Sequence, residues 1–253
     1  MTVETTPKMS WWNRLAHPGE FVRWTRPLIM PLAGITALLF LVGLWFAFFN
    51  SPADYQMGDT VRIMYVHVPT AWLSQFVYSI MAVSALGTLI WRHPMADVSM
   101  KAAAPLGAAF TAMALFTGSM WGRPTWGTFW EWDGRMTSTL ILLFIYLGII
   151  ALWRAFDDKL RAARVVAVFT LVGAINVPII KFSVDWWSTL HQPASVFRAD
   201  GPTMPGSILT PLLVMFFAFT FLSITLQLVA MHTEVRRRRV ATLERKAARG
   251  EAA

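Results

Sequence analysis

Residues 27–49 read PLIMPLAGITALLFLVGLWFAFF and contain no charged side chain. A helix needs about 20 consecutive apolar residues to cross the hydrocarbon core of a bilayer. In lipid every backbone N–H and C=O must be bonded internally, which a helix achieves. The stretch therefore predicts a transmembrane helix, and it is longer than the apolar part of a cleavable signal peptide.

Similar apolar runs recur along the whole chain. Of its 253 residues, 56% are hydrophobic and only 14% are charged, whereas an ordinary soluble domain is about 25% charged. We therefore expect an all-α, polytopic integral membrane protein with six transmembrane helices. The six predicted spans are 27–49, 68–91, 102–120, 138–153, 165–182 and 207–231, of which the fourth is short unless its flanks contribute.

The 22 Lys and Arg residues are unevenly distributed between the connecting segments. Most lie in the N-terminal segment, in the second and fourth connections and in the C-terminal tail, where Arg236–Arg239 form a block. Such a bias marks the cytoplasmic side of a membrane protein. We expect both termini to be cytoplasmic, with a segment 1–26, a membrane domain 27–231 and a basic tail 232–253.

The same bias explains the net charge of +8 without any nucleic-acid partner. The basic block in the tail is read mainly as a topology signal, with anionic lipid or a cytoplasmic partner as the alternative. The outward loops are then 50–67, 121–137 and 183–206.

The chain has no cysteine. This excludes disulfides, thiolate-held metals, thiol redox catalysis and thioether attachment of haem to this chain. Five histidines remain as strong nitrogen ligands. We place His67 and His191 on the outer side, and His17, His93 and His232 at cytoplasmic ends.

The second outward loop contains WGRPTWGTFWEWD at residues 121–133. Tryptophans that anchor a span at the interface usually mark its end singly, whereas this segment has four. It predicts a platform for a large planar apolar ligand, with haem first and a quinone second, while an interfacial anchor stays open. The residues concerned are Trp121, Gly122, Trp126, Gly127, Trp130 and Trp132.

Two outer histidines beside such a platform suit bis-histidine coordination of haem iron. His67 and His191 are the candidate ligands, although a single histidine at a helix end is more often structural. Arg123 and Arg135 offer forked donors for the haem propionates. Asp133 is expected either to orient Arg135 or to hydrogen-bond a ligating imidazole.

The pattern W-G-x-P-x-W-G-x-x-W-x-W-D-x-R at residues 121–135 resembles the WWD signature of haem-handling proteins in cytochrome c biogenesis. Within that superfamily the chain resembles the haem exporter protein C (CcmC) family, from about Trp24 to Met231. Met136 departs from the leucine that is common there, which is a volume-conserving change.

The resemblance implies that His67 and His191 are axial ligands of haem b. It implies that Trp121, Gly122, Trp126, Gly127, Trp130, Trp132 and Asp133 hold the macrocycle at the periplasmic face of the bacterial inner membrane. Haem is then presented to a periplasmic haem chaperone (CcmE), beside a small membrane subunit (CcmD) and an ABC transporter (CcmA/CcmB). The chain has no Walker-type phosphate loop, so ATP hydrolysis is expected in a partner.

Several alternatives stay open. A direct cytochrome c haem-attachment synthase of the same superfamily is usually longer and has an extra histidine pair within its spans. A b-type electron-transfer protein usually places histidine pairs inside the helical bundle. A haem transporter would need a polar path, and a docking subunit would use its tryptophans without haem. No histidine lies within the apolar interior of any predicted span, which favours the delivery protein over the synthase. If covalent capture is catalysed by this chain, the sequence identifies no general acid or base for it.

Overall fold

The computed structural model describes residues 16–187, 189–191, 195–196 and 198–250. Within these ranges the chain is helical and has no β-strand. The helices are α2 (Pro18–Trp45), α3 (Met64–Leu89), α4 (Ala96–Trp126), α5 (Gly134–Ala155), α6 (Lys159–Gly173), α7 (Asn176–Trp186) and α8 (Gly206–Ala248), with a π-helical turn at Phe46–Asn50 and a 3₁₀ turn at Asp59–Ile63.

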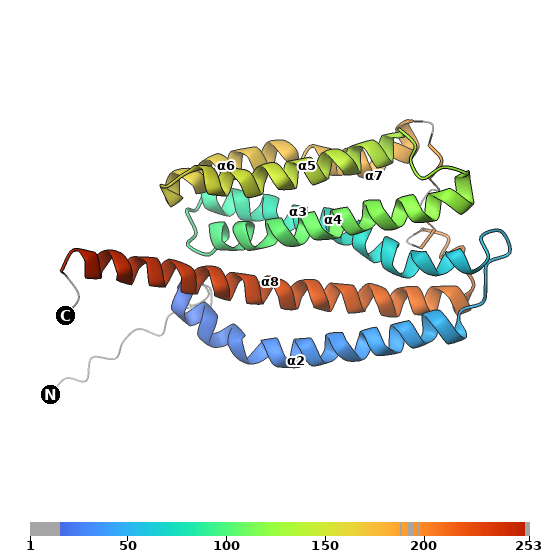
Figure 1. The fold of residues 1–253 in the computed structure, drawn as a ribbon, viewed down its shortest axis with the longest axis horizontal. Helices are drawn as coiled ribbons and strands as arrows, with labels where there is room; N and C mark the ends of the chain where they lie inside the picture. Colours follow the sequence, from blue (N-terminus) through green and yellow to red (C-terminus); the bar gives the residue numbers. More distant parts are fainter. Residues whose placement is uncertain (1–15, 188, 192–194, 197, 251–253) are drawn as a thin grey trace.

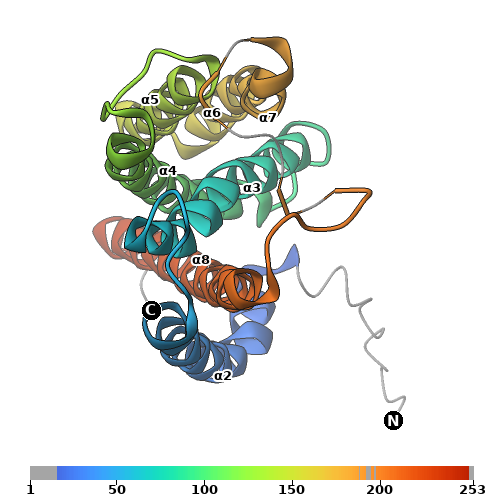
Figure 2. The same ribbon diagram turned by 90° about the vertical axis from the view of Figure 1, so that its right-hand side faces the viewer.

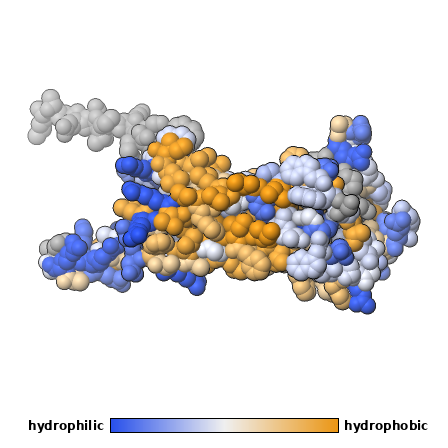
Figure 3. All heavy atoms as spheres, turned by 90° about the horizontal axis from the view of Figure 1, so that it is seen from above, coloured by the Kyte–Doolittle hydropathy of each residue, from blue (hydrophilic) through white to orange (hydrophobic). Residues whose placement is uncertain are grey.

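Six helical segments are long and apolar enough to cross a membrane, with α6 and α7 together forming the fifth. The prediction of an all-α protein with six spans is therefore confirmed. Figure 3 shows a broad hydrophobic surface over the middle of the molecule and hydrophilic residues concentrated towards its two ends. This is the surface expected of a bundle whose middle faces lipid and whose ends face water.

The helices form three neighbouring groups: α2 with α8, α3 with α4, and α5 with α6 and α7 (Figures 1 and 2). The central pair contacts both other groups, whereas α2 packs mainly against α8. Tyr78 and Tyr146 are fully buried between the groups. Their hydroxyls donate to the backbone carbonyls of Thr170 and Ser74, at 3.0 and 2.7 Å. These bonds satisfy the polar ends of large aromatic side chains in an apolar core.

Several helices extend beyond the apolar runs that predict them. Helix α2 begins at Pro18, inside the predicted N-terminal segment, whose residues 1–15 lie outside the described part of the chain. Helix α8 continues through the predicted tail as far as Ala248. Hydropathy detects only the part of a helix that meets lipid, whereas Arg, Lys, Glu and Ala are good helix formers in water as well. Figure 1 shows this extension of α8 projecting past the rest of the bundle.

Candidate functional site

The tryptophan-rich segment is divided between a helix and a loop. Helix α4 continues through Trp121 to Trp126, and Gly127 ends it with a φ of 80°. That left-handed conformation favours glycine at a helix C-cap. The expectation that residues 121–126 lie in a loop is therefore wrong. The hydropathy pattern ends at Met120, but polar residues outside the lipid still continue the helix.

His67 lies in the first turns of α3 rather than in the preceding loop. Its Nδ1 is 3.0 Å from the Ala114 carbonyl oxygen and 3.2 Å from the Thr117 hydroxyl of α4. A carbonyl oxygen can only accept, so we assign the proton to Nδ1 and a lone pair to Nε2. Within the described residues Nε2 has no hydrogen-bond partner. The imidazole also meets the Trp121 ring edge to face, with centroids 5.7 Å apart.

His191 follows α7 and is held in the same way by a different acceptor. Its Nδ1 is 2.7 Å from Asp133 Oδ2, and its ring meets Trp126 with centroids 4.8 Å apart. The carboxylate fixes the proton on Nδ1, which again leaves Nε2 with a lone pair. Since Trp121 and Trp126 both belong to the last turns of α4, this one helix end contacts both imidazoles.

Asp133 has two structural roles at once. It is the N-cap of α5, where its Oδ1 accepts from the Met136 N–H at 2.7 Å, and its Oδ2 accepts from His191 and from the Thr189 hydroxyl. Of the two roles expected from the sequence, the structure has the bond to an imidazole. No ion pair between Asp133 and Arg135 occurs among the described residues.

These contacts set the charge states at the site. Burial by itself raises the pKa of Asp133, but hydrogen bonds from Thr189, Met136 and His191 outweigh it and hold the pKa below its ordinary value. Burial lowers the pKa of His191 below its ordinary value, and the bond and charge of Asp133 only partly oppose this. At neutral pH the carboxylate is therefore ionised and the imidazole neutral, which is the form that binds a metal.

The two arginines of the segment differ in their surroundings. Arg123 is exposed and lies over the Phe129 ring, 4.8 Å from its centroid. Arg135 is partly buried, and its Nη2 makes one long contact of 3.5 Å to the Lys181 carbonyl. Its buried Nε has no partner within the part of the chain that the structure describes. Arg135 thus retains free donors close to the histidines.

The tryptophans do not form one flat surface. Trp130 and Trp132 meet edge to face, with centroids 5.3 Å apart, and Trp132 is 72% exposed. The indole N–H groups of Trp121 and Trp130 are buried, and neither finds an acceptor among the described residues. A buried indole N–H normally has a partner, so these two groups mark places where a ligand or water is expected.

Some residues that shape the site have no signal in the sequence. A Cβ on Gly118 would lie 2.9 Å from His67 Cε1, so only glycine lets this imidazole approach α4. Gly122, which the sequence does single out, is close-packed in a similar way, since a Cβ there would lie 3.0 Å from Trp126 Cε3. Thr117 and Thr189 likewise become visible only through their contacts with His67 and with Asp133. Gly118, Thr117 and Thr189 do not differ in type or spacing from small residues elsewhere in the chain.

The donor set fits an iron porphyrin better than a bare metal ion. No group of three or more His, Asp or Glu side chains suited to hold a metal occurs in the described ranges. Two imidazoles alone leave an ion short of ligands, whereas a porphyrin supplies four in-plane nitrogens and needs only axial ones. Aromatic rings, free indole N–H groups and an arginine with unused donors suit the rest of such a molecule.

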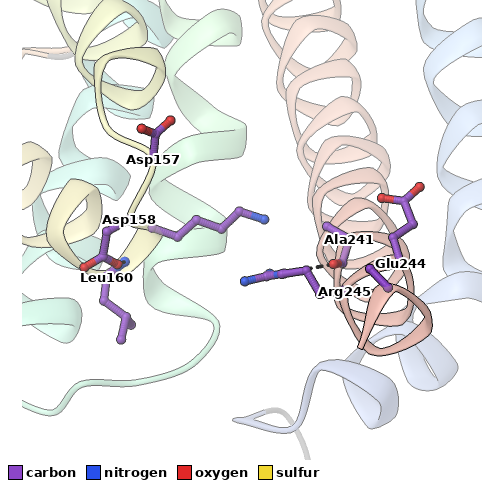
Figure 4. Close-up of a pocket in the computed structure, with 8 residues that line it drawn as sticks. Asp157, Asp158, Leu160, Ala241, Glu244 and Arg245 are labelled. Atoms are coloured by element: carbon purple, nitrogen blue, oxygen red, sulfur yellow. Dashed lines mark hydrogen bonds between the residues drawn. The ribbon is translucent and has the colours of Figure 1, made fainter. Parts of the chain in front are cut away.

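Two hollows of the molecule lie away from the candidate site residues. One of about 680 Å³ separates the start of α6 from the last turns of α8, at the end of the bundle where the C-terminus lies. Figure 4 shows Asp157 and Asp158 on one side and Glu244 and Arg245 on the other. A smaller apolar crevice of about 120 Å³ lies between α3, α4 and α8. Neither is lined by a candidate site residue.

Comparison with known proteins assigns the family. The sequence profile of the family described as Heme exporter protein C matches residues 11–246. The chain is 60% identical over 230 residues to Heme exporter protein C of Bradyrhizobium diazoefficiens, covering 91% of this chain and 87% of that one. It is 45% identical over 213 residues to the Escherichia coli K12 protein of the same name, covering 84% and 83%.

A mitochondrial relative has a related name. A ccmC-like mitochondrial protein of Marchantia polymorpha, named for cytochrome c biosynthesis, is 46% identical over 189 residues, which is 75% of this chain and 78% of that one. The profile match covers most of the chain, and the matches to the two bacterial relatives cover 87% and 83% of those proteins. The chain therefore belongs to the haem exporter protein C family.

Proposed function

We propose that this protein binds haem b reversibly at the outer end of its bundle and presents it to a periplasmic haem chaperone (CcmE) for covalent capture. The observation that carries the proposal is that two imidazoles are hydrogen-bonded in the same way. His67 and His191 each have Nδ1 engaged and Nε2 free, and both contact the tryptophans at the end of α4. The names of the relatives, as haem exporters, support the same conclusion.

In this proposal the two Nε2 atoms hold the iron of the cargo. Trp121, Trp126 and Trp130 cover part of the porphyrin. Gly122 leaves room for the Trp126 ring, and Gly127 ends α4 directly after that tryptophan. The exposed Trp132 lies at the open edge. The propionates pair with Arg135, whose Nε is buried and unbonded within the described chain, or with the exposed Arg123. The vinyl edge then faces the partner, since covalent capture needs a reachable vinyl carbon.

The proposed setting is the bacterial inner membrane, with both termini cytoplasmic and the site periplasmic. The distribution of Lys and Arg supports this orientation. The small subunit CcmD and the ABC transporter CcmA/CcmB are the proposed partners within the membrane. ATP hydrolysis belongs to the transporter, since this sequence has no Walker-type loop.

An absorption spectrum of the detergent-purified protein, expressed with ample haem, tests the proposal. We expect a sharp Soret band in the wild type and its loss or shift in the His67→Ala/His191→Ala double variant. His17→Ala is the matched control, because His17 is exposed and makes no side-chain cap bond. A haem-free wild type contradicts the proposal. An unchanged band in the double variant contradicts the ligand assignment.

The main alternative functions differ in what they do with the haem. An electron-transfer protein would cycle its haem with a quinol, whereas a delivery protein passes it on. A synthase would attach haem directly to a cytochrome. Incubation of the haem-loaded protein with purified chaperone, and separately with an apocytochrome, distinguishes these by haem staining of the acceptor. Covalent haem on the chaperone alone is the expected result.

A further inference from the structure

The two outer imidazoles are supported by acceptors of unequal strength. His191 donates to the carboxylate of Asp133 at 2.7 Å, whereas the Nδ1–H of His67 is shared between the Ala114 carbonyl at 3.0 Å and the Thr117 hydroxyl at 3.2 Å. A hydrogen bond to an ionised acceptor is roughly twice as strong as one between neutral groups. A carboxylate behind an imidazole also makes the opposite nitrogen a better ligand. His191 is therefore the stronger electron donor of the pair.

The carboxylate behind His191 is itself fixed from several directions. The Thr189 hydroxyl donates to the same Asp133 oxygen and accepts from the His191 backbone N–H at 3.1 Å. The other oxygen of Asp133 accepts from Met136 in the first turn of α5. The carboxylate is therefore held in place behind His191, and displacement of the imidazole costs a hydrogen bond to an ionised acceptor.

The acceptors behind His67 keep their other bonds when the imidazole moves. The Thr117 hydroxyl donates to the Met113 carbonyl at 2.7 Å and lies 3.3 Å from the Ala114 carbonyl, all within α4. Few polar groups are left unsatisfied if the imidazole leaves, so its departure costs little. Gly118 packs against His67 Cε1, and this contact limits the ring through van der Waals packing rather than through charge.

From this asymmetry we infer that His191 is the resident axial ligand and His67 the exchangeable one, so that an incoming ligand takes the position of His67 first. The inference rests on the proposed haem binding and concerns the order of release. In the exchange the dative bond from His67 Nε2 to iron breaks, and the lone pair of a neutral donor forms the new bond. The oxidation state of the iron and the net charge of the site are unchanged.

The test compares haem loss from two single variants, His67→Gly and His191→Gly. Each is purified with haem in detergent, and the rate of haem transfer to excess apomyoglobin is followed in the Soret region. We expect His191→Gly to lose haem at least about tenfold faster than His67→Gly, because His191 is the ligand with the stronger hydrogen-bond acceptor behind it. Equal rates, or faster loss from His67→Gly, overturn the inference. A wild type without haem overturns the proposed function as well, whereas a loaded wild type with equal variants overturns this inference alone.

A second pair of variants leaves both imidazoles in place. Asp133→Asn keeps an oxygen for the Met136 N–H but removes the charge behind His191, and Thr117→Val removes one neutral acceptor behind His67. We expect Asp133→Asn to speed haem loss about 10- to 100-fold, and Thr117→Val less than about fivefold.

The midpoint potential of the iron gives an independent spectroscopic measure of the same asymmetry. It should rise in Asp133→Asn, because a weaker donor stabilises ferric iron less, and stay near the wild-type value in Thr117→Val. Elution volume and helical circular dichroism check that both variants fold. A shift in Thr117→Val as large as that in Asp133→Asn contradicts the inference.

Discussion

The two ends of the bundle both contain buried carboxylates, but they differ in what those carboxylates hold. At the end near α8's extension, the buried Glu234 pairs with Lys101 at 2.9 Å and with Arg238 at 2.8 Å, and Arg238 also pairs with Asp97 at 2.7 Å. At the opposite end, Asp133 holds an imidazole whose second nitrogen is unused. The first arrangement joins α4 to α8, whereas in the second the carboxylate orients an imidazole and leaves its Nε2 free to bind a metal.

The difference shows how to tell a structural network from a binding site. Charged groups at the α8 end mostly pair with one another, although Arg238 Nη2 has no partner among the described residues. His232 is bonded there to Thr25 through its Nε2 at 2.6 Å. At the opposite end, Trp121 Nε1, Trp130 Nε1 and Arg135 Nε are buried without partners among the described residues, and the Trp121 ring contacts His67. Polar groups that are buried and unpaired are costly unless something else satisfies them. Substitutions at the first end should therefore lower the free energy of unfolding, and substitutions at the second should weaken the proposed haem binding.

The largest expected effect on stability follows from Glu234→Ala. The change leaves Lys101 and Arg238 partly buried without their shared partner, and removal of one member of a buried pair costs about 3–5 kcal/mol. We expect the free energy of unfolding, measured by denaturant titration in detergent, to fall by at least about 3 kcal/mol, while the Soret band of the folded fraction is unchanged. Glu244→Ala, an exposed change on the same helix, is the control. A normal stability with an altered Soret band would contradict the division between the two ends.

Asp133→Ala should show the opposite pattern. Loss of the carboxylate behind His191 weakens haem retention about 10- to 100-fold, while loss of the N-cap of α5 costs only about 1 kcal/mol of stability. Haem per protein after gel filtration and a thermal unfolding curve measure the two effects separately. If stability falls severely and the residual folded protein retains its haem, Asp133 is structural only.

Gly118→Ala tests whether the shape of α4 positions His67. The new Cβ would lie 2.9 Å from the ring, and such overpacking costs about 1–3 kcal/mol unless the imidazole shifts. We expect a shifted Soret maximum and weaker haem retention. Gly34→Ala is the control variant, because a Cβ added at Gly34 meets nothing within 4 Å. Identical spectra for both variants would show that the imidazole does not depend on Gly118.

The smallest expected effect is that of Thr25→Val at the α8 end. It removes the hydrogen bond to His232 that links α2 to α8, and one such bond contributes about 1 kcal/mol. A modest fall in thermal stability with unchanged haem content is expected. Any loss of haem from this variant would indicate that α2 supports the site at the opposite end, against the separation of the two ends.

The sequence predicts the fold class and the candidate residues, but not the local geometry. The absence of charge in long runs predicts the six spans, and the WWD pattern indicates the family. The helical state of Trp121–Trp126 is missed, because hydropathy reports contact with lipid rather than backbone conformation. The length of α8 is missed for the same reason, since its basic residues continue the helix into water.

By itself the sequence determined that this protein is a six-span helical membrane protein of a haem-handling family, because apolar length and a dense motif are properties of the chain alone. Tertiary structure decided which nitrogen of each histidine is free and which residue fixes it. Ala114, Thr117 and Asp133 are distant from their imidazoles in sequence, and only helix packing brings them within hydrogen-bonding range. The unequal support of His67 and His191 follows from that packing, since an imidazole's strength as a ligand depends on the acceptor behind it.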